Sequence, residues 1–184
     1  MDFNGPYPAP IVHFQELPRA SEGIAHDRPS PDRPIHDDLE TAFSRIREEA
    51  PLEARVECRM VIQGKSRALR PLIRDEAYRI GREALLNAFR HSKAGRVEVD
   101  LEYAPRQFRI AVRDNGTGIT AESFRAGRGG HKGLSGMRDL AERMGAKLKL
   151  LSRAAAGTEV ELSIPGHIAF ASQIHVRRLG SAQV

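Results

Sequence analysis

Residues 96–114 hold two runs in which apolar and polar side chains alternate, with a short turn between them. The alternating apolar positions are Val97, Val99, Leu101 and Tyr103 in the first run and Phe108, Ile110 and Val112 in the second. This period of two predicts two β-strands, and the segment "APRQ" between them predicts a hairpin. A sheet with one apolar face must pack against another layer, so the hairpin also demands helices to cover it.

Apolar residues at helical spacing predict a long helix over 71–91, with Pro71 in its first turn. The same spacing predicts a short amphipathic helix over 36–50 and another over about 134–144, ended by Gly145. Three further strands are predicted, over 54–62, 146–152 and 158–164. The sum predicts an α+β fold: a two-layer α/β sandwich with a mixed, mostly antiparallel sheet and helices on one face.

The domain organisation follows from shifts in composition along the 184 residues. Residues 1–35 are rich in proline, which disfavours helices and sheets, and predict a flexible arm. Residues 36–166 form the predicted domain, whose motifs lie within about 71–166. The stretch 167–184 is weakly patterned and predicts a C-terminal tail.

The overall composition excludes several classes of function. The formal charge of +5 is modest, and aromatic residues are scarce and not interleaved with basic clusters, which argues against nucleic-acid binding. A single cysteine rules out an internal disulfide framework and a cysteine metal cluster. No apolar run approaches the length of a membrane span, and no signal segment opens the chain, so we expect a cytoplasmic protein.

Asp114 ends the second strand of the predicted hairpin. By period two it shares a face with Ile110 and Val112, so we expect its carboxylate to point toward the core layer, where it needs a partner. Gly116 and Gly118 follow, where the backbone must turn tightly or let a ligand come close. An Asx turn at a strand end explains the same residues equally well.

A glycine-rich loop is predicted over 115–136, and its part "GRGGHKGLSGM" leads directly into a helix. Free backbone N–H groups ahead of a helix N-terminus suit phosphates, and Arg128 and Lys132 add positive charge. A solvent-exposed loop without a ligand is the alternative reading, because a glycine-rich loop alone is a weak signal.

Thr158 opens the last predicted strand, directly after Gly157. It shares a face with Val160 and Leu162, so we expect its hydroxyl to point inward. Taken alone, the start of an ordinary hairpin strand explains it as well.

Three polar residues recur every fourth position along the long helix: Glu83, Asn87 and His91. This spacing stacks them on one helical face. Carboxylate and amide oxygens are hard ligands that suit Mg²⁺, which also binds substrate phosphates. The alternative for this motif alone is a solvated helix face.

Along the chain the four motifs come in the order of the Glu83–Asn87 helix, the Asp114 turn, the glycine-rich loop and Gly157–Thr158. Taken together and in that order, they strongly resemble the ATP-binding domain of the GHKL superfamily, which includes sensor histidine kinases. Within it, "HKGLSGMRDLA" is similar to a glycine box of one histidine kinase subfamily, and "YRIGREALLNAFRHSKA" is similar to that subfamily's N box. The resemblance covers roughly residues 50–166 and implies the Bergerat ATP-binding fold.

The resemblance implies ATP and Mg²⁺ as ligands and assigns a role to each matching residue. Asp114 would accept a hydrogen bond from the adenine amino group, and Gly116 and Gly118 would let the base lie against the backbone. Thr158 would support the hydrogen-bond network on the adenine side. Asn87 would ligate Mg²⁺, with Glu83 beside it as a base or water-orienting group. At the phosphates, the resemblance implies His91, Lys132, Gly133, Leu134 and Gly136, and a mobile lid over 117–133.

The function implied is transfer of the γ-phosphoryl group of ATP to a histidine, with a response regulator or a histidine-bearing dimerisation domain as partner. His26 and His36 precede aspartates as phosphoacceptors do, but neither lies on a long helical hairpin, and helix capping explains His36 better. Leu140 stands where the subfamily carries an arginine. The alternatives are a stand-alone switch that resembles the anti-sigma-factor serine kinases of the same superfamily, and a non-catalytic nucleotide-binding regulatory module.

Overall fold

The computed structural model describes residues 38–46, 56–119 and 131–171. The elements follow in the order α1 (Leu39–Ile46), β1 (Glu57–Gly64), α2 (Pro71–His91), β2 (Arg96–Ala104), β3 (Gln107–Asp114), α4 (His131–Arg143), β4 (Lys147–Arg153), β5 (Gly157–Pro165) and α5 (Gly166–Ala169). The predicted arm over 1–35, with His26 and the nearby His36, lies outside the described residues.

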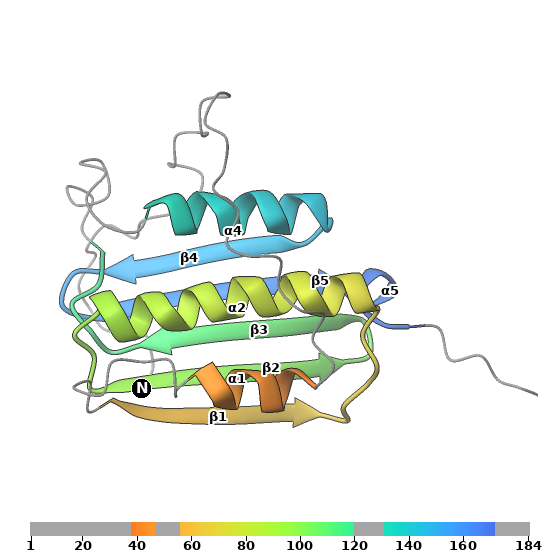
Figure 1. Ribbon diagram of the computed structural model, residues 1–184, viewed down its shortest axis with the longest axis horizontal. Helices are drawn as coiled ribbons and strands as arrows, with labels where there is room; N and C mark the ends of the chain where they lie inside the picture. Colours follow the sequence, from red (N-terminus) through yellow and green to blue (C-terminus); the bar gives the residue numbers. More distant parts are fainter. Residues whose placement is uncertain (1–37, 47–55, 120–130, 172–184) are drawn as a thin grey trace, which may run out of the picture.

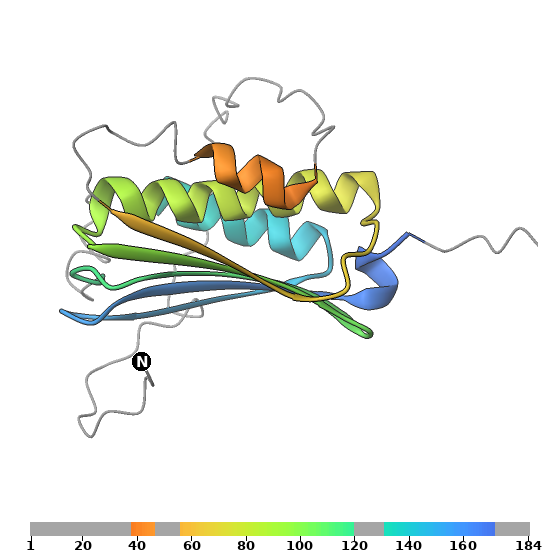
Figure 2. The ribbon, with the colours of Figure 1, turned by 90° about the horizontal axis from the view of Figure 1, so that it is seen from below.

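The five strands form one sheet in the order β1-β2-β3-β5-β4. β1 pairs with β2 in parallel, and the three other pairs are antiparallel. Helices α1, α2 and α4 all lie on the same face of this sheet (Figures 1 and 2). The predicted two-layer α/β sandwich with a mixed, mostly antiparallel sheet is therefore confirmed. Among the described helices, none is both long and apolar enough to cross a lipid bilayer.

The core lies between the sheet and the helices, where the two predicted periodicities meet. The alternating apolar residues of the hairpin all face the helices and are at most 6% exposed: Val97, Val99, Leu101, Tyr103, Phe108, Ile110 and Val112. They pack in one cluster with α2, which contributes Ile80 and Leu85 at 1% exposure each. Burying a side chain of this size contributes roughly 1.5–3 kcal/mol, so this interface holds the layers together.

The observed element bounds correct several expectations. α2 and the hairpin lie where predicted, but α4 begins at His131, within the loop predicted over 115–136. Gly133, predicted in the loop, is therefore helical, and Gly136, where the predicted loop overlaps the helix predicted over about 134–144, is helical as well. The strand predicted over 54–62 runs from Glu57 to Gly64, because the ladder with β2 continues to the Gly64–Tyr103 pair.

The segment just after Pro165 belongs to the fold rather than to a separate tail. The backbone of Leu69 forms a bridge with Phe170, and the Arg67 guanidinium lies 3.7 Å from the centroid of the Phe170 ring. Ala169 and Phe170 are 0% and 4% exposed and join the core cluster. Sequence analysis assigned both to the tail because a four-residue helix is too short to show periodicity.

Helix α1 packs on α2 through a single glycine. A Cβ atom at Gly81 would lie 2.5 Å from Cζ of Phe43, so only glycine leaves room for the ring. Phe43 also contacts Tyr78, with ring centroids 5.5 Å apart. This close approach seats α1 against the middle of α2 (Figure 2).

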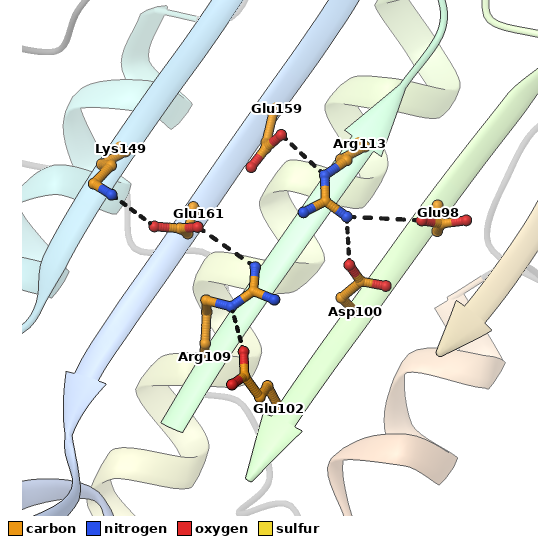
Figure 3. A network of polar contacts seen from close by, with 8 residues as sticks. All are labelled: Glu98, Asp100, Glu102, Arg109, Arg113, Lys149, Glu159 and Glu161. Atoms are coloured by element: carbon orange, nitrogen blue, oxygen red, sulfur yellow. Dashed lines mark hydrogen bonds and ion pairs between the residues drawn. The ribbon is translucent and has the colours of Figure 1, made fainter. Parts of the chain in front are cut away.

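The sheet face opposite the helices carries ion pairs that cross from strand to strand (Figure 3). Arg113 on β3 donates through Nε to Glu159 at 2.9 Å and through Nη1 to Asp100, and the same Nη1 lies 3.7 Å from Glu98. Burial opposes its charge, but the hydrogen bonds with Glu159 and Asp100 outweigh this and raise the pKa of Arg113. Arg113 thus joins β2, β3 and β5.

Arg109 repeats this arrangement four residues earlier on β3, two positions away on the same face. It donates to Glu102 at 2.7 Å and to Glu161 at 3.4 Å, and Glu161 also accepts from Lys149 of β4 at 3.0 Å (Figure 3). Ala111, between the two arginines on the same face, is 0% exposed. Its small side chain is covered by the charged layer.

We expect Gly81→Ala to destabilise the fold although alanine favours helices by about 1 kcal/mol over glycine. The added methyl group meets the buried Phe43 ring, and overpacking of this kind costs about 1–3 kcal/mol. The matched control is Gly136→Ala in α4, where a Cβ would meet nothing within 4 Å. This variant should stabilise the fold, because alanine loses less conformational freedom than glycine in a helix. Chemical denaturation measures both, and equal stabilisation by the two variants would refute the packing of α1.

Arg113→Met should lower the free energy of unfolding by about 3–5 kcal/mol, because it leaves two buried carboxylates unpaired. These belong to Asp100 and Glu159, which are 6% and 9% exposed. Lys149→Met, at a side chain 62% exposed, should cost under about 1 kcal/mol. Chemical denaturation measures both variants, and an Arg113→Met deficit no larger than that of Lys149→Met would contradict this account.

Candidate functional site

Asp114 ends β3 on the helix-facing side, where period two places it. It pairs in register with Thr158 of β5, and its Oδ1 accepts a hydrogen bond from the Gly116 backbone N–H at 2.8 Å. Burial raises the pKa of the Asp114 carboxyl, while hydrogen bonds from the backbone N–H groups of Gly116 and Thr158 oppose this rise. The Asx turn is therefore present, and it holds a half-buried acidic group on the helix-facing side, at the end of the central strand β3.

Gly116 and Gly118 are required by the protein's own backbone. A Cβ at Gly116 would lie 2.1 Å from the carbonyl oxygen of Ser92, at the end of α2. Gly118 has φ +68°, and a Cβ there would lie 2.0 Å from the carbonyl oxygen of Arg153, at the end of β4. The turn after Asp114 is thus wedged between two other elements, which fixes the position of the carboxylate.

Ser92 ties this turn to α2 and was not singled out by the sequence analysis. Its carbonyl oxygen accepts from the Thr117 N–H at 2.8 Å, and its hydroxyl donates to the Ala88 carbonyl oxygen and accepts from the Ala94 N–H. It is 8% exposed. A serine directly after a long helix was the only signal available, and such residues usually serve the helix end alone.

Glu83 and Asn87 lie together on α2, as their spacing predicts. The Asn87 amide donates through Nδ2 to Glu83 Oε1 at 3.3 Å, and both side chains are half-buried. A Cβ at Gly133 would lie 2.0 Å from the same Oε1, so the carboxylate rests directly against the first turn of α4. The N-terminus of a helix is its positive end and favours a carboxylate there.

His91 is the last residue of α2 and is exposed. It therefore belongs to the predicted polar row by spacing but lies at the open end of the helix. Lys132 lies in α4, but its side chain is outside the part of the chain that the structure describes, as are Arg128 and most of the predicted lid.

The remaining predicted residues of α4 differ in their surroundings. Leu134 is 6% exposed and belongs to the core, so only its backbone is placed to act in a site. Gly136 has open space beside its Cα, which would allow a ligand to approach the helix. This differs from Gly133, where the space is taken by Glu83.

Thr158 is linked to a second hydroxyl that the sequence analysis missed. Its Oγ1 lies 2.9 Å from Oγ of Ser152 on β4, and Ser152 Oγ accepts from the Ile119 N–H at 2.7 Å. The register pairs Ser152 with Thr158, so both point to the helix-facing side. This pair holds the chain where it leaves the Asp114 turn. Ser152 follows the apolar Leu148 and Leu150 in alternation, which was its only signal.

The fold therefore gathers two groups of predicted residues. Asp114, Gly116, Gly118 and Thr158 lie at the shared end of β3 and β5, and this group contacts the end of α2 through Ser92. Glu83 and Asn87 lie earlier on α2, against the start of α4. Within the described segments no three His, Cys, Asp or Glu side chains cluster to hold a metal ion.

Residues 73–168, more than half of the chain, match the family described as histidine kinase-, DNA gyrase B-, and HSP90-like ATPase. Sensor histidine kinase LiaS of Bacillus subtilis (strain 168) is 37% identical over 93 residues, which cover 50% of this chain and 25% of LiaS. Nitrate/nitrite sensor protein NarX of Escherichia coli (strain K12) is 37% identical over 81 residues, covering 44% and 13%. The chain thus spans a quarter or less of the length of these relatives.

Solved structures share the fold. The histidine kinase domain from the Erythrobacter litoralis EL346 blue-light activated histidine kinase has a TM-score of 0.54 at 23% identity, covering 69% of this chain and 62% of that one. The mycobacterial sensor histidine kinase MprB has a TM-score of 0.51 at 19% identity, covering 73% and 93%. Together with the sequence match, these findings show that the chain belongs to the histidine kinase-, DNA gyrase B-, and HSP90-like ATPase family.

Proposed function

We propose that this chain is the ATP- and Mg²⁺-binding catalytic module of a sensor histidine kinase. It donates the γ-phosphoryl group of ATP to a histidine on a partner domain, in a two-component pathway that ends at a response regulator. The observation that carries the proposal is the junction at Glu83, whose carboxylate is bound by Asn87 and rests against Gly133. This junction joins the two motifs that would serve the phosphates.

The Asp114 end of the site fits the adenine base. A carboxylate has about four lone-pair sites, so the half-buried Asp114 carboxylate, which the backbone N–H groups of Gly116 and Thr158 already bond, keeps lone pairs for an amino group. Thr158 adds a hydroxyl on the same face, directly opposite in register. Acceptors in such a setting suit the exocyclic amino group of adenine.

The Asn87 end of the site fits Mg²⁺ bound mainly through phosphate. Because the amide nitrogen of Asn87 donates to Glu83, the amide oxygen is directed away from that carboxylate and is the ligand it offers. Mg²⁺ in phosphate-transfer sites keeps several waters and takes only one or two protein ligands. The lack of a multi-residue metal cluster in the described segments suits this mode of binding.

The chemistry proposed for this chain is positioning with charge stabilisation, as in phosphoryl transfer generally. Bound Mg²⁺ would neutralise charge on the phosphates. Glu83, with its orientation set by Asn87, would serve as a base or orient the attacking group, and the first turn of α4 would offer backbone N–H groups at Gly133 and Leu134 to the phosphates. Gly136 lies beyond this turn, and the open space beside it would let the phosphates approach the helix. Because ATP is supplied in the cytoplasm, we expect this kinase module to work there.

Asn87→Ala should abolish Mg²⁺-dependent binding of ATP, and with it any transfer, because it removes both the metal ligand and the partner of Glu83. The matched control is Leu72→Ala on the first turn of the same helix, where the side chain is 70% exposed. Calorimetric titration with ATP, with and without Mg²⁺, measures the effect. Asn87→Ala binding like the parent would refute the assignment.

Transfer itself is tested with ATP labelled on its γ-phosphate, mixed with the chain alone and with a histidine-bearing partner domain. Acid-labile label on the partner supports histidine transfer. Acid-stable label on a serine would support a serine kinase switch instead, and binding without any transfer to the cognate partner would support a non-catalytic module.

Asp114→Asn should lower the affinity for ATP without lowering the free energy of unfolding. Because burial raises the pKa of Asp114 in the folded chain, its ionised form costs stability at neutral pH, and this cost disappears as the pH falls below the unfolded-state value. The neutral amide keeps an oxygen for the Gly116 N–H, so the variant should match or exceed the parent in free energy of unfolding at pH 7, and the difference should shrink in acid. Its affinity for ATP should fall roughly tenfold or more. Unchanged affinity would show that Asp114 does not bind the nucleotide.

A further inference from the structure

The hydroxyl of Ser152 is the most fully engaged polar group near Asp114. Ser152 is 4% exposed, and its Oγ contacts three partners. These are the Ile119 N–H at 2.7 Å, the Gly157 carbonyl oxygen at 3.2 Å and the Thr158 Oγ1 at 2.9 Å. No function is assigned to it by the proposed mechanism.

Counting protons decides which way each of these hydrogen bonds runs. A serine hydroxyl has one proton to donate and two lone pairs that accept. The Ile119 N–H only donates, so it takes one lone pair, and the Gly157 carbonyl only accepts, so it takes the proton. The one remaining place is a lone pair, and Thr158 must therefore donate its own proton to Ser152. All three contacts are satisfied together in this arrangement alone.

The consequence falls on Thr158. Its single hydroxyl proton is spent on Ser152, so toward any ligand its oxygen can only accept. Thr158 is opposite Asp114 in register, and both side chains lie on the helix-facing side of the sheet. This end of the site then presents two acceptors next to each other and no hydroxyl donor from Thr158.

We infer that Ser152 is a positioning residue that fixes the Thr158 hydroxyl as an acceptor and so makes the site select a purine with a 6-amino group over one with a 6-oxo group. This inference rests on the proposed nucleotide site and adds to it a residue that sets its selectivity. An amino group offers N–H donors to both acceptors, whereas a carbonyl oxygen in the same place faces lone pairs. A buried polar group left without its partner costs more than a hydrogen bond gains, which is why such a site discriminates.

The test compares ATP with ITP, which differ at the purine 6-position, by calorimetric titration in Mg²⁺. Ser152→Ala frees the Thr158 proton, so Thr158 can donate to the 6-oxo group. We expect the ratio of ATP affinity to ITP affinity to fall about threefold to tenfold, the effect of one neutral hydrogen bond, chiefly through tighter binding of ITP. A purely structural role for Ser152 would weaken both nucleotides equally and leave the ratio unchanged.

Thr158→Val provides the second arm and keeps the proposal testable if Ser152→Ala does not fold. Valine has nearly the shape of threonine but lacks the oxygen, so ATP affinity should fall by a similar factor while ITP affinity holds or rises. The double variant completes a cycle: Ser152→Ala should leave the ratio unchanged in the Thr158→Val background, because its effect passes through that hydroxyl. The free energy of unfolding of each variant is measured beside the affinities.

The outcomes separate this inference from the proposed function. A parent chain that binds neither nucleotide refutes the proposed function itself. A parent that prefers ATP, with an unchanged ratio in Ser152→Ala or in Thr158→Val, refutes only the inference. A change of equal size from Ser152→Ala in both Thr158 backgrounds would also overturn it.

Discussion

The alternation of side chains along β3 is the constraint on which the rest of the structure depends. Consecutive residues of a strand point to opposite faces, so Arg113 faces the charged layer and Asp114 faces the helices. Arg113 holds β3 between β2 and β5 through Asp100 and Glu159. The register that results places Asp114 opposite Thr158. A slip of one residue would move the carboxylate to the wrong face and the arginine into the core.

Long periodic segments were the predictable part of the fold. α2 has 21 residues and an apolar side that recurs over many turns, and the hairpin has two clear alternating runs, so their positions followed from the pattern. The start of α4 did not, because Gly133 and Gly136 disfavour a helix in isolation. The contact with Glu83 explains why the helix begins this early, since a glycine at 133 allows the first turn of α4 to approach α2. Tertiary packing thus overrides local preference.

The predicted site residues divide in the same way. Asp114, Glu83 and Asn87 were placed correctly in the fold because each follows from the period of its own element. Ser92 and Ser152 were missed because their partners are far away in sequence or are backbone groups, and no periodic signal records such contacts. The glycines of the Asp114 turn were predicted for the right positions, but the structure adds a reason. They leave room for the backbone of Ser92 at the end of α2 and of Arg153 at the end of β4.

Helix α2 connects these features because each of its sides has a different task. Its apolar side packs on the sheet, Gly81 receives Phe43 of α1, and Glu83 receives Gly133 of α4. Its end carries Ser92, which is bonded to the turn after Asp114. Both groups of site residues are therefore positioned by the same helix, α2. A change in the position of α4 would first alter the contact of Gly133 with the Glu83 carboxylate and the hydrogen bond between Glu83 and Asn87. The Asp114 turn would keep its own contacts with β4 and β5.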